Sequence, residues 1–384
     1  MIPYGKQNIS NQDVKQIIKV LNSNWLTQGP MVKKFEDRLT NYTKAKFSTV
    51  VNSATSALHI ACLALGLKKH DFLWTVPNTF VSSANCALFC GANVDFVDID
   101  PVTKNMSVQA LNDKLIIAKK SNRLPKVVVP VAFGGQSCDL KAIKALSKKF
   151  KFKILEDASH GIGGFYQGHP IGSCVWSDLT VFSFHPVKII TTGEGGAVMT
   201  NDPNLDSKLK LYRTHGITKN QKEFKNKVDG FWSYEMQELG LNYRMTDFSA
   251  ALGLSQINRI NNFVKKRTKI AERYHDSLRR TGIQLPKLLE GYKSSWHLYV
   301  INWDNKKFKR NRNDAINYLR KNKIGCTVHY IPVHYHPYYQ KLGFKKDDYN
   351  NSKYHYETAI SLPIYPDLSF QDQSLVIKKL KNLL

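Results

Sequence analysis

The stretch DFLWTVPNTFVSSANCALFCGANVDFVDID, residues 71–100, alternates short apolar runs with a helical one. Residues 71–76 and 93–100 have the apolar, β-branched and aromatic content of buried strands, whereas residues 82–91 have the pattern of a helix. The alternation continues with a helix, a strand, a helix and a strand over residues 108–120, 126–133, 139–150 and 152–159. This order predicts an α/β fold with a mostly parallel sheet between helices. Such sheets place their ligands at the carboxyl ends of the strands.

The pattern changes near residue 247, and 384 residues are enough for two domains. We expect a large domain over residues 1–250 and a smaller α+β domain over residues 251–384. One long helix, from residue 247 to about Gly282, is predicted to join them. Further elements are expected as helices over 11–22 (capped by Asn11 or Asp13), 54–66 and 312–321, and as strands over 297–303 and 326–332.

The composition indicates a soluble globular protein, with 42% hydrophobic and 22% charged residues. No apolar run reaches membrane-spanning length and the N-terminus has no apolar signal core, so we expect a cytoplasmic protein without a membrane partner.

The formal net charge of +26 raises the alternative of a basic nucleic-acid-binding regulator. The lysines are scattered along the chain rather than gathered in one arm, which argues against nucleic acid as a partner.

The six cysteines form no CxxC pair. Cys86 and Cys90 are four residues apart, but no histidine follows at a spacing that completes a zinc site. We therefore expect buried free thiols and no metal.

The segment VFSFHPVKIITTGEGGAVMTND, residues 181–202, places one lysine, Lys188, between an apolar run and a glycine-rich turn. Its neighbours are Pro186, Val187, Ile189 and Ile190. This setting predicts that the amine of Lys188 is withdrawn from water, which lowers its pKa. A neutral, positioned amine forms a Schiff base with an aldehyde, which favours an enzyme with a carbonyl cofactor. The alternative is a lysine stem that crosses an apolar surface with its amine in water.

A lysine that binds pyridoxal phosphate needs a carboxylate partner for the pyridine nitrogen. The segment ILEDASHG supplies one directly after an apolar strand. Asp157 is the better candidate, because strand alternation turns Glu156 to the opposite face. His160 is a candidate to hydrogen-bond or pack on the cofactor ring. A helix cap is the alternative role for Asp157, and a structural role is the alternative for His160.

The phosphate of such a cofactor needs hydroxyl and amide donors, ideally at a helix N-terminus. Asn52, Ser53 and Thr55 directly precede or begin an apolar helix, with an ordinary helix cap as the alternative role. Ser183 and Asn242 are further candidate donors. Phe80 follows another strand and is a candidate to stack on the ring, with packing in the core as its alternative.

These motifs resemble the sugar aminotransferase family of fold-type-I pyridoxal-phosphate enzymes, also called the DegT/DnrJ/EryC/StrS group. The resemblance runs nearly end to end. It rests on NWLTQGPMVKKFE, NSATSALHIA, PNTFVSSANCALFCGANVDFVDID, LEDASHGIGG, SFHPVKIITTGEGGAVMTND, LGLNYRMTDFSAALGLSQ, VHYIPVH and SLPIYPDLS. Within the family, the chain most resembles the transaminases of pseudaminic acid biosynthesis. These aminate the C4 keto group of a UDP-linked 6-deoxy sugar, with glutamate as the amino donor.

The resemblance implies a role for each matching residue. Lys188 is implied as the Schiff-base lysine and proton shuttle, Asp157 as the partner of the pyridinium nitrogen, and His160 as a neighbour of the phenolic oxygen. The implied phosphate-binding residues are Ser53, Ala54, Thr55 and Ser183. Asn242 matches a residue that reaches the cofactor of a neighbouring subunit, which implies a homodimer with shared sites. The residues that match the nucleotide-sugar pocket are Tyr4, Asn24, Trp25, Leu26, Thr27, His329 and Tyr330, together with Ser53, Ser183 and Asn242.

The chain also departs from the family pattern. Relatives often carry histidine or tyrosine where Ala132 and Phe133 stand, which leaves the role of Gln136 open. Some relatives dehydrate sugars, but these carry histidine at the position of Lys188, so that activity is disfavoured. A transaminase that acts at C3, or on a dTDP or GDP sugar, stays open as an alternative.

Overall fold

The computed structural model describes all residues, 1–384. Its α-helices are α1 (Asn11–Leu21), α2 (Pro30–Thr43), α3 (Ala54–Ala64), α4 (Ser82–Phe89), α5 (Val108–Lys120), α6 (Leu140–Phe150), α7 (Pro203–Arg213), α8 (Asp247–Ile257), α9 (Ile260–Leu278), α10 (Arg312–Lys321), α11 (Pro337–Gln340), α12 (Asn350–Thr358) and α13 (Phe370–Lys381). The strands are β1 (Phe47–Val51), β2 (Phe72–Thr75), β3 (Asn93–Phe96), β4 (Val127–Val129), β5 (Lys153–Asp157), β6 (Phe165–Tyr166), β7 (His169–Pro170), β8 (Leu179–Ser183), β9 (Gly196–Thr200), β10 (Ile217–Thr218), β11 (Glu235–Met236), β12 (Tyr292–Lys293), β13 (Tyr299–Asn302) and β14 (Ala359–Leu362).

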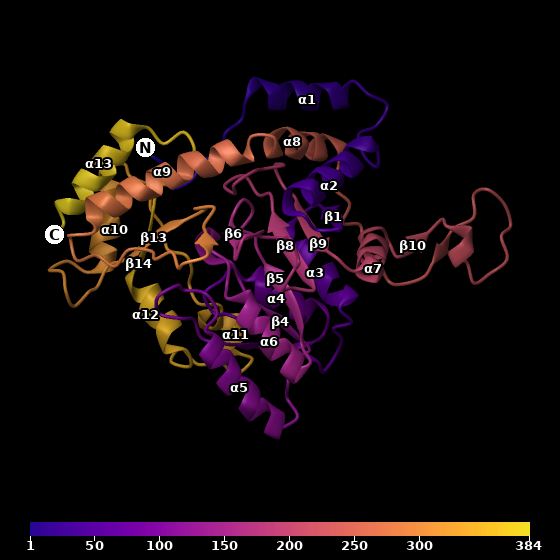
Figure 1. The fold of residues 1–384 in the computed structure, drawn as a ribbon, viewed down its shortest axis with the longest axis horizontal. Coiled ribbons are helices and arrows are strands. Elements are labelled where there is room, and N and C mark those ends of the chain that lie inside the picture. Colours follow the sequence, from indigo (N-terminus) through magenta and orange to yellow (C-terminus); the bar gives the residue numbers. More distant parts are fainter.

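A seven-stranded sheet forms the centre of the molecule, in the order β1-β9-β8-β5-β4-β2-β3 (Figure 1). All its strands run parallel except β9, which is antiparallel to both β1 and β8. The predicted mostly parallel sheet is therefore confirmed. The exception arises because β8 and β9 are joined by the short segment that carries Lys188 rather than by a crossover helix.

Side chains from alternate positions of the strands fill two cores, one on each face of the sheet. In β5, Leu155 packs with α3 and α4 on one face, whereas Ile154 packs with α5 and α6 on the other. Helices thus cover both faces, as the alternating sequence pattern predicts. The carboxyl ends of the parallel strands meet at one edge, where β5 ends at Asp157 and β8 ends at Ser183.

The C-terminal part of the chain builds a separate hydrophobic core from α9, α10, α13 and the antiparallel pair β13–β14. These elements gather at one end of the molecule, on the left of Figure 1. The division of the chain into two domains at residue 250 stays a prediction.

Three details of the sequence prediction were wrong. The expected long helix is interrupted at Asn258 and Arg259, where it divides into α8, which packs against α1 and α2, and α9, which packs against α13. Helix α1 is capped by Ser10, and Asp13 completes a capping box from inside the helix. Residues 326–332 form no strand, and only Thr327 makes an isolated bridge, to Ser361.

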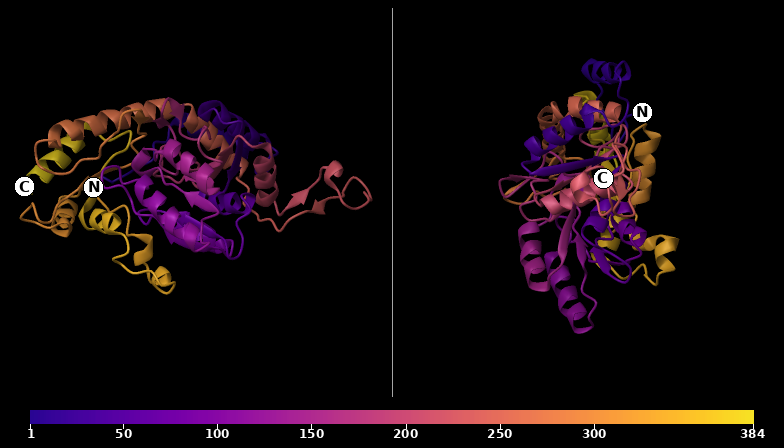
Figure 2. Two further views of the ribbon diagram at one scale, coloured as in Figure 1. Left: turned by 60° about the horizontal axis from the view of Figure 1, so that its bottom comes forward. Right: turned by 90° about the vertical axis from the view of Figure 1, so that its right-hand side faces the viewer.

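An arm formed by β10, β11 and the loop between them extends away from the main body (Figures 1 and 2). It carries large apolar side chains in contact with water, and Phe231 is 95% exposed. The chain has no helix with the length and apolar character needed to span a membrane.

Candidate active site

A cavity of about 490 Å³ lies at the carboxyl ends of the parallel strands. We call it the cleft. Its walls contain eleven of the residues predicted from the sequence, namely Tyr4, Ser53, Ala54, Thr55, Phe80, Asp157, His160, Ser183, Lys188, His329 and Tyr330. These residues come from segments that are more than 300 positions apart in the chain. The cleft thus brings together groups that the sequence only suggested separately.

Lys188 reaches the cleft from the segment between β8 and β9. The next two residues, Ile189 and Ile190, are buried in the hydrophobic core and hold this segment in place. Burial lowers the pKa of the Lys188 amine to about 8, and the negative charge of Asp157 opposes part of this shift. The amine is therefore far more often neutral near physiological pH than that of an ordinary lysine.

Asp157 ends β5 and turns its carboxylate toward the cleft. The hydroxyl groups of Ser83 and Ser159 each donate a hydrogen bond to it at 2.6 Å, and the Ser159 amide donates a third at 3.0 Å. Glu156 lies on the opposite face, where it accepts a hydrogen bond from Thr180 and burial raises its pKa to about 7. Of the two adjacent carboxylates, only Asp157 is thus presented to a ligand.

His160 and Tyr330 form a hydrogen-bonded pair on the wall of the cleft. The Gly134 amide donates to Nδ1 of His160 at 3.3 Å, so the ring hydrogen lies on Nε2, 2.9 Å from the Tyr330 hydroxyl. Burial lowers the pKa of His160 well below its ordinary value, which keeps the ring neutral. Because Tyr330 accepts this hydrogen bond, its own hydroxyl hydrogen is available to a ligand.

Hydroxyl groups surround the N-terminus of α3. Ser53 caps this helix, and Thr55 in its first turn exchanges a hydrogen bond with Ser82 at 2.8 Å. Ser183 adds a hydroxyl from the end of β8. Free backbone amides, a helix dipole and several hydroxyl groups form a favourable environment for a phosphate.

Six predicted residues do not line the cleft of this chain. Asn24, Trp25, Leu26 and Thr27 are exposed, and so are Asn52 and Asn242. Residues 24–27 lie beside the segment that follows Asn242. Thr27 and Thr246 form a bridge, and the Asp247 amide donates a hydrogen bond to the Leu26 carbonyl. Gln136 also lies elsewhere, in a separate small cavity with Lys104. Phe80 is in the cleft wall rather than the core, and 59% of it is exposed.

Ten residues in the lining of the cleft were not predicted from the sequence, and three of them contact the predicted Asp157 or His160 directly. The hydroxyl groups of Ser83 and Ser159 fix the Asp157 carboxylate by hydrogen bonds. Both serines lie within sequence motifs that were interpreted for other residues. His297 packs against His160 with ring centroids 4.4 Å apart, and its Nδ1 has no hydrogen-bond partner. No local signal marks His297, because it comes from a part of the chain that meets the cleft only on folding.

The groups in the cleft match the chemistry of pyridoxal phosphate. Lys188 supplies an amine with a lowered pKa, Asp157 supplies a fixed carboxylate, and the N-terminus of α3 supplies hydrogen-bond donors for the phosphate.

No group of three or more His, Cys, Asp or Glu side chains is arranged to hold a metal ion. Five of the six cysteines are buried and none forms a disulfide, which confirms the expectation of free thiols.

A family model described as the DegT/DnrJ/EryC1/StrS aminotransferase family matches residues 7–381. The chain belongs to this aminotransferase family. It is 37% identical to the UDP-4-amino-4,6-dideoxy-N-acetyl-beta-L-altrosamine transaminase of Campylobacter jejuni, over 100% of this chain and 98% of the relative.

Solved structures from the family have the same fold. The Helicobacter pylori aminotransferase PseC, involved in the biosynthesis of pseudoaminic acid, superposes with a TM-score of 0.90 at 32% identity, covering 100% of this chain and 98% of PseC. The PMP form of the sugar aminotransferase Spr1654 from Streptococcus pneumoniae has a TM-score of 0.90 at 28% identity, covering 100% and 99%. The predictions of the family, of the fold class and of pyridoxal phosphate as the cofactor are confirmed by these matches.

Proposed function

We propose that this protein transfers the amino group of glutamate to the C4 keto group of a UDP-linked 4-keto-6-deoxy-N-acetylhexosamine, in pseudaminic acid biosynthesis. The observation that carries the proposal is the convergence of Lys188 and Asp157 on one cleft, in a chain that matches the whole length of a UDP-sugar transaminase. The proposal includes a cytoplasmic location for the enzyme.

Each residue of the cleft has a defined task in this reaction. Pyridoxal phosphate, when bound, supplies an aldehyde that takes up the amine and a ring that stores an electron pair. Lys188 removes a proton from the α-carbon of glutamate in the first half-reaction and delivers a proton to C4 of the sugar in the second, acting as base and then as acid. Asp157 keeps a proton on the ring nitrogen, because its fixed negative charge stabilises the positive one.

The remaining polar groups position the ligands. Ser53, Thr55 and Ser183 are assigned to the cofactor phosphate together with the free amides of α3. Tyr330 directs its free hydroxyl hydrogen toward the ring oxygen or the keto oxygen of the sugar. The reaction is balanced. Glutamate gives up its amine and leaves as 2-oxoglutarate, and the amine appears at C4 of the sugar.

The lowered pKa of Lys188 predicts how the cofactor-free enzyme reacts with pyridoxal phosphate as the pH changes. The neutral fraction of the amine rises about tenfold per pH unit up to its pKa and then levels off. The initial rate of covalent attachment should therefore increase toward pH 8 and change little above it. Stopped-flow absorbance measures this rate. A rate that keeps rising to pH 10 would show that Lys188 behaves like an ordinary solvated lysine.

The proposal includes a homodimer whose two copies share their sites. The arm carries four large exposed apolar side chains, Phe231, Trp232, Tyr234 and Met236, and the exposed Leu239 follows it. The exposed Trp25 and Leu26 lie outside the cleft of their own chain. A surface of this kind normally packs against a partner. A second copy explains it together with the exposed position of Asn242.

Replacing Phe231 and Trp232 by serine should weaken the dimer by at least about 100-fold, because two aromatic side chains lose their burial. Analytical ultracentrifugation across a concentration series measures the dissociation constant. Tyr338→Ser is the matched control, since Tyr338 is 60% exposed on α11, away from the arm (Figure 1). A wild-type protein that sediments as a monomer at all concentrations contradicts the homodimer.

The function is tested by incubating the pyridoxal-phosphate enzyme with glutamate and a panel of keto sugars linked to UDP, dTDP or GDP. Nuclear magnetic resonance of the product identifies the carbon that bears the new amine. Amination of C4 on the UDP sugar supports the proposal. Amination at C3, or only of a dTDP or GDP sugar, replaces it with another nucleotide-sugar aminotransferase.

A further inference from the structure

Three of the six cysteines lie together where α3 packs against α4. Cys62 is in the last turn of α3, Cys86 is in α4, and Cys90 ends α4 as its C-cap residue. We call these three side chains the thiol cluster. It lies outside the lining of the cleft. The remaining cysteines are separate, each in a different hydrophobic core: Cys138, Cys174 and Cys326.

Cys90 has the properties of a reactive thiol. It is the only one of the six cysteines that is not buried. A hydrogen bond with Cys62 and another with His59 lower the pKa of the Cys90 thiol, although burial opposes part of the shift. His59 is fixed beside it, because Nδ1 lies 3.2 Å from the Tyr243 hydroxyl and the ring packs on Phe89 with centroids 5.5 Å apart. The thiolate is the form of cysteine that reacts with oxidants, so Cys90 is the thiol that is oxidised first.

Cys62 has the complementary properties. Its side chain is fully buried. Hydrogen bonds with Cys86 and Cys90 raise the pKa of the Cys62 thiol, which therefore keeps its hydrogen and donates it toward Cys90. Cys86 is engaged elsewhere, since its own thiol donates to the Ser83 carbonyl at 3.3 Å. Cys62 is thus the thiol that is placed to react with an oxidised Cys90.

The two helices that carry the thiol cluster begin at the cleft. Thr55 in the first turn of α3 exchanges a hydrogen bond with Ser82, the first residue of α4, at 2.8 Å. The next residue, Ser83, donates to the Asp157 carboxylate at 2.6 Å. A change in the packing of α4 on α3 is therefore transmitted to the groups that hold Asp157.

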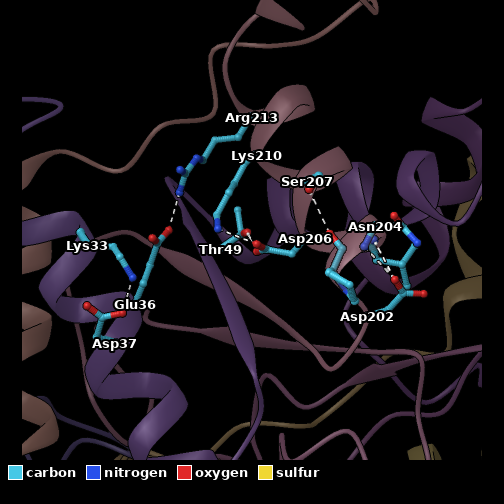
Figure 3. Close-up of polar contacts among 12 residues, drawn as sticks. Lys33, Glu36, Asp37, Thr49, Asp202, Asn204, Asp206, Ser207, Lys210 and Arg213 are labelled. Carbon is cyan, nitrogen blue, oxygen red and sulfur yellow. Dashed lines mark hydrogen bonds and ion pairs between the residues drawn. The ribbon is translucent and has the colours of Figure 1, made fainter. Parts of the chain in front are cut away.

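Polar contacts fix α3 from its other side through α7, which packs against it. Asp206 of α7 accepts a hydrogen bond from Thr49 of β1 at 3.1 Å and pairs with Lys210 at 2.5 Å (Figure 3). Arg213, at the end of α7, pairs with the buried Glu36 of α2 at 2.6 Å. Helix α4 has no charged side chain and no side-chain cap at its N-terminus. Of the two helices, α4 is thus the freer to shift.

We propose that Cys90 and Cys62 form a peroxide-sensitive pair, and that their disulfide pulls α4 away from Asp157 and lowers the activity of the enzyme. A bond between two sulfur atoms is about 2.05 Å long, much shorter than the distance between two unbonded thiols. Its formation draws the end of α4 toward α3 and weakens the hydrogen bond between Ser83 and Asp157. The oxidation is independent of the proposed function, whereas its effect on turnover rests on that function.

The oxidation is balanced with hydrogen peroxide as the oxidant. The Cys90 thiolate attacks one oxygen of the peroxide and the O–O bond breaks. The sulfur becomes a sulfenic acid, and the other oxygen takes up a proton and leaves as water. The Cys62 sulfur then attacks the Cys90 sulfur, its hydrogen passes to the departing oxygen, and a second water leaves. The two thiols together lose two electrons and two protons, which convert one peroxide into two waters.

Peptide mapping tests the pair directly. Treatment of the pyridoxal-phosphate enzyme with hydrogen peroxide, followed by alkylation, digestion and mass spectrometry, should identify two peptides joined through Cys62 and Cys90. Cys90→Ser should form no such link, and in Cys62→Ala the Cys90 thiol should accumulate as a sulfenic acid that dimedone labels. Cys326→Ser is the matched control and should form the link, because Cys326 lies in the C-terminal core and burial raises its pKa. Thermal melting shows whether each variant is folded.

The effect on the site is measured with glutamate alone, as the rate at which the absorption band of the bound cofactor changes. After catalase has removed the peroxide, this rate should be at least about tenfold lower in the oxidised wild type, the usual value of a hydrogen bond to a charged group. Dithiothreitol should restore the rate. Cys90→Ser should react equally fast before and after the peroxide treatment.

The outcomes separate this inference from the proposed function. If neither the disulfide nor the dimedone label appears at Cys90, the inference is wrong. If the disulfide forms and the rate with glutamate stays the same, or if Cys90→Ser loses the same rate after peroxide, the control of Asp157 by this pair is wrong. If the disulfide forms but the reduced enzyme reacts with neither glutamate nor any keto sugar, the thiol pair stands and the proposed function is wrong.

Discussion

Replacing Lys188 by alanine is expected to lower turnover by at least about 10³-fold, because the reaction loses its acid–base group. The variant should also lose its covalent link to the cofactor. After treatment with borohydride, mass spectrometry of the wild type should show the mass of the chain plus the cofactor, and that of the variant only the chain. Normal turnover by Lys188→Ala, or a persisting covalent adduct at another position, would remove Lys188 from the mechanism.

The chain offers a close control for this experiment in Lys104. Burial also lowers the pKa of its amine to about 8. Lys104 lies in the small cavity with Gln136 and donates to the Pro101 carbonyl, away from Asp157. Lys104→Met should therefore retain turnover within a few-fold of the wild type. A comparable loss in both variants would mean that buried lysines support the fold rather than the chemistry.

Replacing Asp157 by asparagine is expected to lower turnover by about 10²- to 10⁴-fold. The estimate follows from the roughly 3–5 kcal/mol that is lost when one partner of a buried charge pair is removed, at about 1.4 kcal/mol for each tenfold change in rate. The substitution keeps the size of the side chain, so the effect isolates its charge. Steady-state kinetics with glutamate as the varied substrate should show a reduced kcat, and the absorption band of the bound cofactor should shift because the ring nitrogen loses its proton.

Glu156→Gln is the matched control for Asp157→Asn. Both carboxylates stand at the end of β5, but Glu156 faces the core on the other side of the sheet and bonds to Thr180. The amide retains an acceptor for that hydrogen bond, so turnover should change by less than about threefold. Equal losses at the two positions would contradict the assignment of the two carboxylates to opposite faces.

The short-range patterns of the chain were sufficient to predict the sheet and the residues at the centre of the cleft. Strands β2 to β5 and the helices between them follow from apolar periodicity, since burial on both faces requires continuous apolar runs. The rule that ligands bind at the carboxyl ends of parallel strands then pointed to Ser53, Asp157 and Ser183. All of these line the cleft.

Other features depend on contacts that no local pattern records. The segment 326–332 is apolar enough for a strand, yet His329 bonds to Ser361 and the Tyr330 amide bonds to Asn78. The break between α8 and α9 contains neither proline nor glycine. Arg259 at that break instead reaches Asp13 and Asn8 near the N-terminus.

The sequence by itself determined the fold class and the chemical groups at the ends of the strands, because both depend on residues that are close together in the chain. Only the tertiary structure decided that Lys188 and Asp157 share one cleft and that Glu156 faces away from it. The reason is geometric. A folded chain places side chains through contacts between distant segments, and the residue types alone do not specify which of those segments meet.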